Sequence, residues 1–189
     1  MKKFIIGLII GLLLPLVGGY LFIKMGGMPM AASGATPLPM EEKVADMALT
    51  AATAKSIDKT SPVPADETNL TEGAHVYVAN CAFCHGLPGQ HATSAAKGMF
   101  PLPPQFLNKD ELMTDDPVGR SYWIISNGIR LTGMPGFTGM LSDTQIWQLS
   151  QLIKNADKLP ASTQAELTKP AEAPAPASPA QQPPQKPKK

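Results

Sequence analysis

The sequence predicts an all-α protein, in which a small helical domain is preceded by an N-terminal transmembrane helix and followed by a disordered proline-rich tail. Three observations predict this class. Residues 4–23 contain no charge and read as a membrane helix. Between residues 66 and 160, apolar side chains recur every three or four positions beside helix-capping signals. No stretch alternates apolar and polar residues over enough positions to indicate a strand.

The N-terminal segment, residues 1–24, is predicted to be a membrane anchor. Lys2 and Lys3 precede the uncharged run 4–23, which as a helix would extend about 30 Å, the thickness of the hydrocarbon core of a bilayer. A signal peptide cut within residues 30–34 is the alternative, although secretory apolar regions are usually shorter, about 7 to 15 residues. Both interpretations export the rest of the chain, because the lysines stay on the cytoplasmic side.

Residues 25–65 are expected to form a linker rich in Gly, Ala, Met, Thr and Pro. The alanine-rich part, residues 40–57, could form a helix. Thr50, Thr53 and the scarcity of large apolar side chains argue against a stable independent unit. The methionines are interpreted as linker or membrane-proximal residues rather than as a copper site. They are Met25, Met28, Met30, Met40 and Met47.

The first helix of the domain is predicted to run to about Asn80, with Asn69 or Thr71 as its N-cap. Gly73 and Tyr77 lie on one face of this helix, one turn apart. A glycine inside a helix costs about 1 kcal/mol relative to alanine. Gly73 is therefore predicted to lie where another element packs too closely to leave room for a Cβ.

Cys81, Cys84 and His85 form a C-x-x-C-H element that contains both cysteines of the chain. This spacing lets two thiols add across the vinyl groups of one haem while the histidine reaches the iron. A disulfide, a thioredoxin-like pair and half of a zinc site are the alternatives. A zinc site would need a second ligand pair, and His75 and His91 do not supply the H-x-x-x-H pattern. Both histidines are expected to be exposed to solvent.

A second helix of the domain is predicted over residues 118–126. Asp116 serves as the capping acid and Pro117 occupies its first position, while Asn127 and Gly128 end it. Its large apolar side chains should line the haem pocket or pack in the core. They are Tyr122, Trp123, Ile124 and Ile125.

A six-coordinate iron needs a second axial ligand, methionine or histidine. Met134 is the best candidate, because Pro135 restrains its backbone to an extended conformation. Gly133 and Gly136 let the chain run against a flat macrocycle. Met140 lacks this sequence context. Met99 and Met113 are weaker candidates still.

The last helix of the domain is predicted to start with a capping box formed by Ser142 and Gln145. It ends near Ala156, before Pro160. Its apolar stripe is the expected packing partner of Gly73. The stripe comprises Ile146, Leu149 and Ile153, flanked by Trp147.

These motifs resemble those of a bacterial class I cytochrome c over residues 69 to about 160. The matching positions are Gly73, Tyr77, Cys81, Cys84, His85, Gly86, Gly133, Met134, Pro135 and Trp147. The resemblance implies a small class I cytochrome c fold around one covalent haem c, with the first and last helices crossing nearly at right angles. It implies thioethers at Cys81 and Cys84, with His85 and Met134 as the proximal and distal iron ligands. It also implies that residues 101–104 pass the proximal side of the haem.

The sequence departs from this family at Gln151, where an aromatic residue often follows Trp147 by one turn. The chain thus divides into a membrane anchor or signal (1–24), a linker (25–65), a haem domain (66–160) and a disordered tail (161–189). The tail contains one leucine as its only large aliphatic residue, so it cannot bury a core. Its closing lysines are expected to be solvated.

The predicted haem domain carries six basic and nine acidic residues, a formal charge of −3. This balance excludes a lysine-ringed docking face, and no basic surface interleaved with aromatic residues indicates nucleic-acid binding. Arg120 or Arg130 could neutralise a haem propionate. The sequence shows no separate grouping of acid, base and nucleophile that would indicate an enzyme.

The sequence therefore predicts a membrane-tethered monohaem electron carrier. It would transfer single electrons between redox protein partners, for example as the cytochrome subunit of a respiratory or photosynthetic complex. The expected location is the inner (cytoplasmic) membrane, with one span and the haem domain facing the periplasm or extracytoplasmic side. Two alternatives stay open: a haem-based gas or redox sensor in which Met134 dissociates, and an assembly or scaffold subunit of a larger complex.

Overall fold

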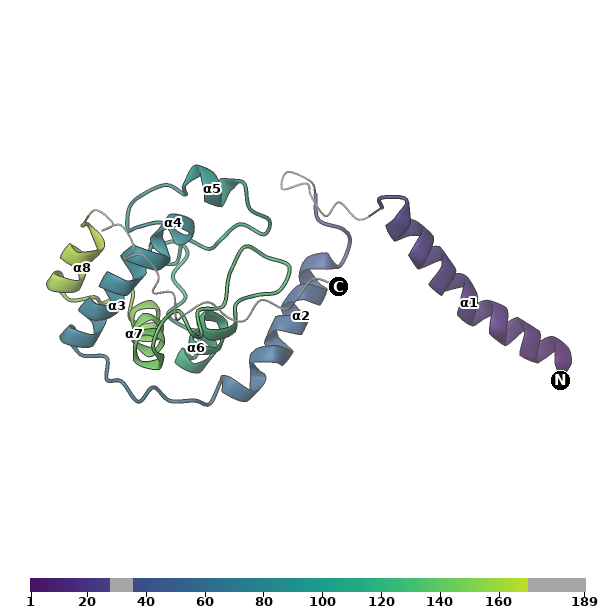
Figure 1. Ribbon diagram of the computed structural model, residues 1–189, viewed down its shortest axis with the longest axis horizontal. Helices are drawn as coiled ribbons and strands as arrows, with labels where there is room; N and C mark the ends of the chain where they lie inside the picture. The colour runs from purple at the N-terminus through teal and green to yellow at the C-terminus, as the bar shows by residue number, and fades with distance from the viewer. Residues whose placement is uncertain (28–35, 170–189) are drawn as a thin grey trace. The chain divides into compact units, whose positions relative to one another are not determined.

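The computed structural model describes residues 1–27 and 36–169, within two compact units, Met1–Lys43 and Val44–Lys189 (Figure 1). The described residues contain helices and no β-strand, as the all-α prediction requires. In chain order they are α1 (Lys2–Lys24), α2 (Glu41–Thr53), the 3-10 turn η1 (Ala54–Ser56), α3 (Glu67–Asn80), α4 (Ala82–His85), α5 (Ser94–Lys97), α6 (Val118–Asn127), α7 (Asp143–Lys154) and α8 (Ala161–Leu167). The expected cleavage segment, residues 30–34, and the closing lysines of the tail lie outside the described residues.

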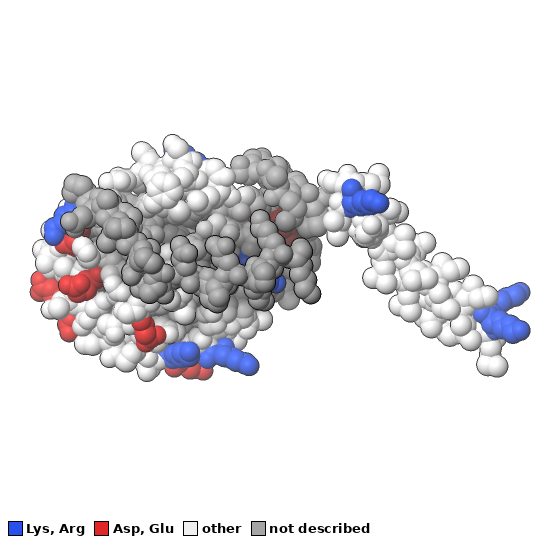
Figure 2. Space-filling model, in the orientation of Figure 1, with Lys and Arg blue, Asp and Glu red and all other residues white. Residues whose placement is uncertain are grey.

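Helix α1 is long and apolar enough to cross a membrane, with a mean hydropathy of 2.4. Figure 2 shows basic side chains at its two ends and no charged side chain between them. Pro15 lies inside the helix without ending it, as membrane helices tolerate. A signal sequence near the N-terminus has the same length and apolar character.

Residues 53–63, which we call the strap, pack against the helical domain although they belong to the predicted linker. Thr53 at the end of α2 is fully buried and Ser56 is 4% exposed. A Cβ on Gly119 of α6 would overlap the carbonyl oxygen of Ser56 and lie 2.9 Å from that of Lys59. The strap therefore contacts α6 backbone to backbone, at a position where only glycine leaves room.

Helices α3 and α7 also cross in direct backbone contact. A Cβ on Gly73 would lie 2.6 Å from the carbonyl oxygen of Gln148 and 3.4 Å from the Cβ of Leu152. Side-chain carbons do not approach a backbone carbonyl so closely, because the atoms would overlap. The predicted packing role of Gly73 is confirmed.

The start of α3 differs from the prediction. Its N-cap is Asp66, whose Oδ1 accepts a hydrogen bond of 2.9 Å from the backbone N–H of Asn69. The prediction that Asn69 or Thr71 caps the helix was wrong. The helix begins about one turn earlier, because the Asp66 side chain accepts from a backbone N–H of the first turn that has no partner within the helix. The extra turn brings Glu67 into the helix.

The capping box of α7 is confirmed. The Gln145 backbone N–H donates to the Ser142 Oγ at 3.2 Å, and the Ser142 N–H donates to the Gln145 Oε1 at 2.9 Å. This start turns the predicted apolar stripe of α7 toward α3 and the core. The buried core residues are Ala74, Val76, Tyr77, Val78, Phe106, Leu107, Ile125, Phe137, Ile146, Leu149, Leu152, Ile153 and Leu167.

Helix α6 begins at Val118 with Pro117 as its N-cap, so Asp116 does not cap it. The Asp116 carboxylate instead lies 3.6 Å from the Nε of Arg120, one turn into the helix. On the face toward α7, the ring of Tyr122 stacks on Trp147 with centroids 3.9 Å apart. This pair ties α6 to α7 through aromatic contact.

Helix α8 occupies residues that the sequence places in the disordered tail. Its Thr163 and Leu167 side chains are fully buried against α3, and the Oγ1 atoms of Thr163 and Thr71 lie 3.0 Å apart. The structure differs from the expectation because a single leucine at the right register suffices to dock one short helix on an existing core. Residues 170–189, which hold most of the tail, lie outside the described part of the chain.

Candidate functional site

The C-x-x-C-H element begins where α3 ends. The backbone N–H of Cys81 still donates to the carbonyl of Tyr77 in α3, at 2.8 Å. The N–H of His85 then donates to the Cys81 carbonyl at 2.9 Å, which closes the single turn of α4. Gly86 ends that turn at φ 69°, in the left-handed region that favours glycine. The end of α3 therefore holds both cysteines and the histidine on one compact turn.

The two cysteines are free, partly buried thiols. Burial, and to a smaller extent the neighbouring Cys84, raises the pKa of Cys81 to about 12. Cys81 also packs against the hydrophobic core. Cys81 therefore presents a neutral thiol at the edge of an apolar interior.

The ring of His85 is oriented by a backbone carbonyl. Its Nδ1 lies 2.9 Å from the carbonyl oxygen of Pro104. Because a carbonyl can only accept, Nδ1 carries the proton and Nε2 keeps a free electron pair. Burial lowers the pKa of His85, and the bond to Pro104 partly opposes this shift. The imidazole is thus neutral, fixed in one tautomer and available as a metal ligand through Nε2.

Tyr77 supports this turn from beneath. Its hydroxyl donates a hydrogen bond of 2.7 Å to the carbonyl oxygen of Gly86, and its side chain is fully buried. Burial raises the pKa of Tyr77 well above its usual range. The ring of Phe106 meets Tyr77 edge to face at 5.8 Å and lies 4.5 Å from the ring of His85. These contacts link α3, the C-x-x-C-H turn and residues 101–106, which we call the proline-rich loop.

Met134 lies on a loop that closes tightly on the end of α6. A Cβ on Gly128 would lie 2.6 Å from the backbone nitrogen of Gly136, so the two ends of the loop touch. Inside it, the Met134 N–H donates to the Thr132 Oγ1 at 3.1 Å, and the Met134 carbonyl accepts from the N–H of Ile129 at 3.1 Å. Met134 is partly buried and packs against the same core as Cys81.

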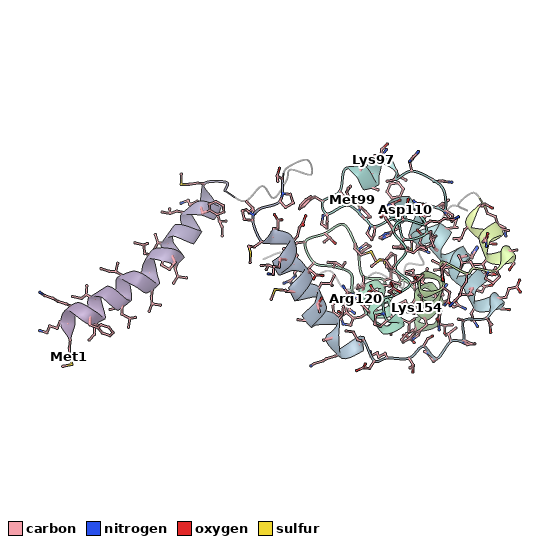
Figure 3. All side chains as sticks on the ribbon, turned by 180° about the vertical axis from the view of Figure 1, so that it is seen from behind. Met1, Lys97, Met99, Asp110, Arg120 and Lys154 are labelled. Atoms are coloured by element: carbon pink, nitrogen blue, oxygen red, sulfur yellow. The ribbon has the colours of Figure 1, made fainter. Side chains whose placement is uncertain are left out.

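The other candidate ligands differ in exposure and position. Met140 is 61% exposed, and Met113 packs on the core. Met99 follows α5 (Figure 3), with its sulfur 3.1 Å from the position of a Cβ on Gly133. The Met99 thioether therefore lies against the Met134 loop.

His75 and His91 are both exposed, as expected. The Nδ1 of His75 lies 3.2 Å from a carboxylate oxygen of Glu166 on α8. Arg130 is exposed, and Arg120 is engaged with Asp116. His75 and Arg120 thus make these contacts away from the C-x-x-C-H turn, and the propionate role of the arginines stays a prediction.

Sequence reasoning missed Gln105 and Glu111. Gln105 is 7% exposed, and its side-chain amide donates to the carbonyls of Cys84 and Pro103 at 3.1 and 2.9 Å. Glu111 accepts from the Gln105 backbone N–H at 2.7 Å. A buried glutamine directly after a proline run was the available signal, but its partner Cys84 lies far away in sequence.

The donors fit a covalently attached haem by their chemistry. Two free thiols three residues apart could form the thioethers, and the His85 tautomer leaves Nε2 for the iron. The thioether of Met134 is a soft donor of the kind that completes such a site. These donor types are those that hold a covalent haem c, whose iron gains and loses one electron.

Comparison with protein families gives a match over the helical domain. The family described as "Cytochrome C oxidase, cbb3-type, subunit III" matches residues 68–153. No curated protein and no solved structure matches the chain. The matched segment begins in α3 and ends in α7, and it includes the C-x-x-C-H turn and the Met134 loop.

Proposed function

We propose that the chain is a membrane-tethered carrier of single electrons, built on a class I monohaem cytochrome c domain that the family match over residues 68–153 supports. The observation that carries the proposal is the hydrogen bond between the Nδ1 of His85 and the carbonyl of Pro104. It holds the imidazole in the tautomer that an iron ligand needs, in a chain that also offers two thiols on the same turn.

We assign the site residues as follows. Cys81 and Cys84 form the thioethers, and the Nε2 of His85 and the sulfur of Met134 are the axial ligands. A haem c bound here would supply an iron that gains and loses one electron. Tyr77 and Pro104 hold the C-x-x-C-H turn, while the tight loop around Met134 presents its thioether.

A carrier role suits this residue set better than catalysis. With two protein ligands on the iron, a substrate can reach it only if a ligand leaves. With its Nε2 on the iron and its Nδ1 proton donated to the Pro104 carbonyl, His85 would not be free to accept or deliver protons. Methionine ligation in an apolar pocket favours the reduced state relative to two histidines, and a fairly positive potential is expected.

The membrane topology follows from α1. Lys2 and Lys3 precede the apolar helix, and the positive-inside rule keeps them in the cytoplasm. The haem domain then lies on the periplasmic or extracytoplasmic side of the inner membrane, attached by one span. A redox partner in the same membrane, such as a respiratory oxidase of the type that the matched family serves, is the proposed electron acceptor or donor.

The ligand assignment is tested on full-length protein purified in mild detergent. One covalent haem, a low-spin spectrum with a thioether-to-iron near-infrared band, and no CO binding by the ferrous protein are expected. Met134→Leu should lose the band and bind CO. Met140→Leu, which changes a 61% exposed side chain, should keep the wild-type spectrum. CO binding by the unmodified protein would favour a sensor instead.

The carrier role is tested in the parent membrane. Replacing both Cys81 and Cys84 by serine should abolish electron transfer through the complex that co-purifies with the chain. Full activity with intact assembly would leave only a scaffolding role. Membrane extraction tests the anchor separately, since a soluble protein beginning near Ser33 would mean that α1 is a cleaved signal.

A further inference from the structure

Gln105 connects the proline-rich loop to the C-x-x-C-H turn by its side chain. The Nε2 donates to the carbonyl of Cys84 at 3.1 Å and to that of Pro103 at 2.9 Å. The side chain is 7% exposed, and the backbone N–H is held by Glu111 at 2.7 Å. One amide group thus joins the residue before His85 to the residue before Pro104.

The orientation of this amide follows from its partners. Two carbonyl oxygens face one end of the amide, and only the NH₂ end can donate to both. The Oε1 then points toward Gly86, where a Cβ would overlap it. This oxygen is buried and has no donor among the described residues. Burying the Oε1 without a hydrogen-bond donor costs free energy. An apolar side chain would avoid this cost but could not make the two hydrogen bonds that the Nε2 makes.

We propose that Gln105 is a positioning residue for the axial histidine. Its two hydrogen bonds fix the Cys84 and Pro103 carbonyls relative to each other. They thereby hold the Pro104 carbonyl against the Nδ1–H of His85, at 2.9 Å. This inference rests on the proposed function, because the position of Pro104 matters to the potential only if His85 ligates the iron.

The consequence is electronic as well as structural. A hydrogen bond from Nδ1 makes an imidazole a more basic ligand, which favours the oxidised metal. If Gln105 is lost, Pro104 is held less firmly and the bond to His85 weakens. The midpoint potential of the holoprotein then rises.

The test compares wild-type holoprotein with Gln105→Met, which keeps the length of the side chain and removes both donors. The expected result is a positive shift of the midpoint potential and faster solvent exchange of the His85 Nδ1 proton by NMR, with one covalent haem retained. Gln164→Met, on the exposed side of α8, is the matched control and should change neither property. An unchanged potential and unchanged exchange in Gln105→Met would overturn the proposal.

A second measurement decides the matter if Gln105→Met does not accumulate as holoprotein. In the wild-type holoprotein, the side-chain amide protons of Gln105 should exchange more slowly than those of the exposed Gln164. Equal rates would contradict the proposal. The proposed function fails separately, if the wild-type protein holds no covalent haem or if its spectrum shows that His85 is not a ligand.

Discussion

The side-chain amide of Gln151 on α7 donates a hydrogen bond of 3.0 Å to the backbone carbonyl of Val63 in the strap. In the class I cytochromes c that this chain resembles, an aromatic residue often stands at that position. A glutamine at this position has a physical reason, because its amide can donate a hydrogen bond to the strap. A hydrocarbon aromatic ring could only pack against it. The strap is thus hydrogen-bonded to α7 through Gln151. It packs against the backbone of α6 at Gly119, where the absence of a Cβ leaves room for it.

The first prediction concerns strap docking. Gly119→Ala places a Cβ on the carbonyl oxygen of Ser56, so the strap should detach. We expect limited proteolysis to cut residues 53–63 faster in this variant, while the haem spectrum stays unchanged. Gly98→Ala is the control, because its Cβ would have its nearest neighbour at an ordinary 3.5 Å. Equal cleavage of both variants would contradict docking of the strap at α6.

The second prediction concerns the helix crossing. In Gly73→Ala the Cβ lies 2.6 Å from the Gln148 carbonyl, so α3 and α7 must move apart. The free energy of unfolding of the holoprotein in denaturant should fall by about 1–3 kcal/mol. Gly98→Ala should change it by less than about 0.5 kcal/mol. A Gly73→Ala protein as stable as the control would mean that the crossing is looser than the structure shows.

Gly73 and the C-x-x-C-H element could be predicted because each signal is local. A glycine inside a helix is costly at its own position, and the cysteine spacing is complete within five residues. The capping box of α7 is local as well. The capping acid of α3, Asp66, was missed because several residues that favour the N-cap position lie close together there. The sequence alone does not show which of them caps the helix.

Gln105, the strap and α8 depend on partners far away along the chain. Gln105 reads as an ordinary polar loop residue until Cys84 is placed beside it. The strap is linker by composition, and only the backbone contact at Gly119 shows that it docks. The polar composition of residues 161–167 predicts disorder, yet burial of Leu167 stabilises α8 against the domain. None of these pairings follows from sequence periodicity, because each depends on contacts that form only in the folded chain.

The third prediction concerns the buried hydroxyl of Tyr77. In Tyr77→Phe the Gly86 carbonyl loses its 2.7 Å hydrogen bond, and the free energy of unfolding at pH 7 should fall by about 1–3 kcal/mol. Burial raises the pKa of Tyr77, so its contribution is present below the unfolded pKa and is lost as pH rises toward the folded one. The gap between wild type and variant should therefore shrink above about pH 10, by up to about 1.36 kcal/mol per pH unit.

Denaturant unfolding at several alkaline pH values measures this gap directly. Lysine titration affects both proteins in the same way and cancels in the difference. A gap that stays constant from neutral to alkaline pH would show that the Tyr77 hydroxyl is not buried as the structure has it.

The last prediction concerns the Glu166 carboxylate of α8 and its contacts with Lys169 and His75. Lys169 donates to the Glu166 carboxylate, and His75 of α3 lies 3.2 Å from it. The bond from Lys169, and then that from His75, lowers the pKa of Glu166. A lowered pKa stabilises the fold above the unfolded value, about 4.3 for glutamate, and the contribution disappears as pH falls through the folded value.

Glu166→Gln should accordingly lower the free energy of unfolding by about 0.2–1 kcal/mol at neutral pH, the range of exposed ion pairs. Once the wild-type carboxyl is protonated, the two proteins should be equally stable. Unfolding free energies of the holoprotein between neutral and acidic pH measure both limits. Glu72→Gln, an exposed carboxylate on α3, is the control and should show no such convergence. If the Glu166→Gln deficit persisted under acidic conditions, it would come from lost packing of α8 on α3 rather than from the charge of Glu166.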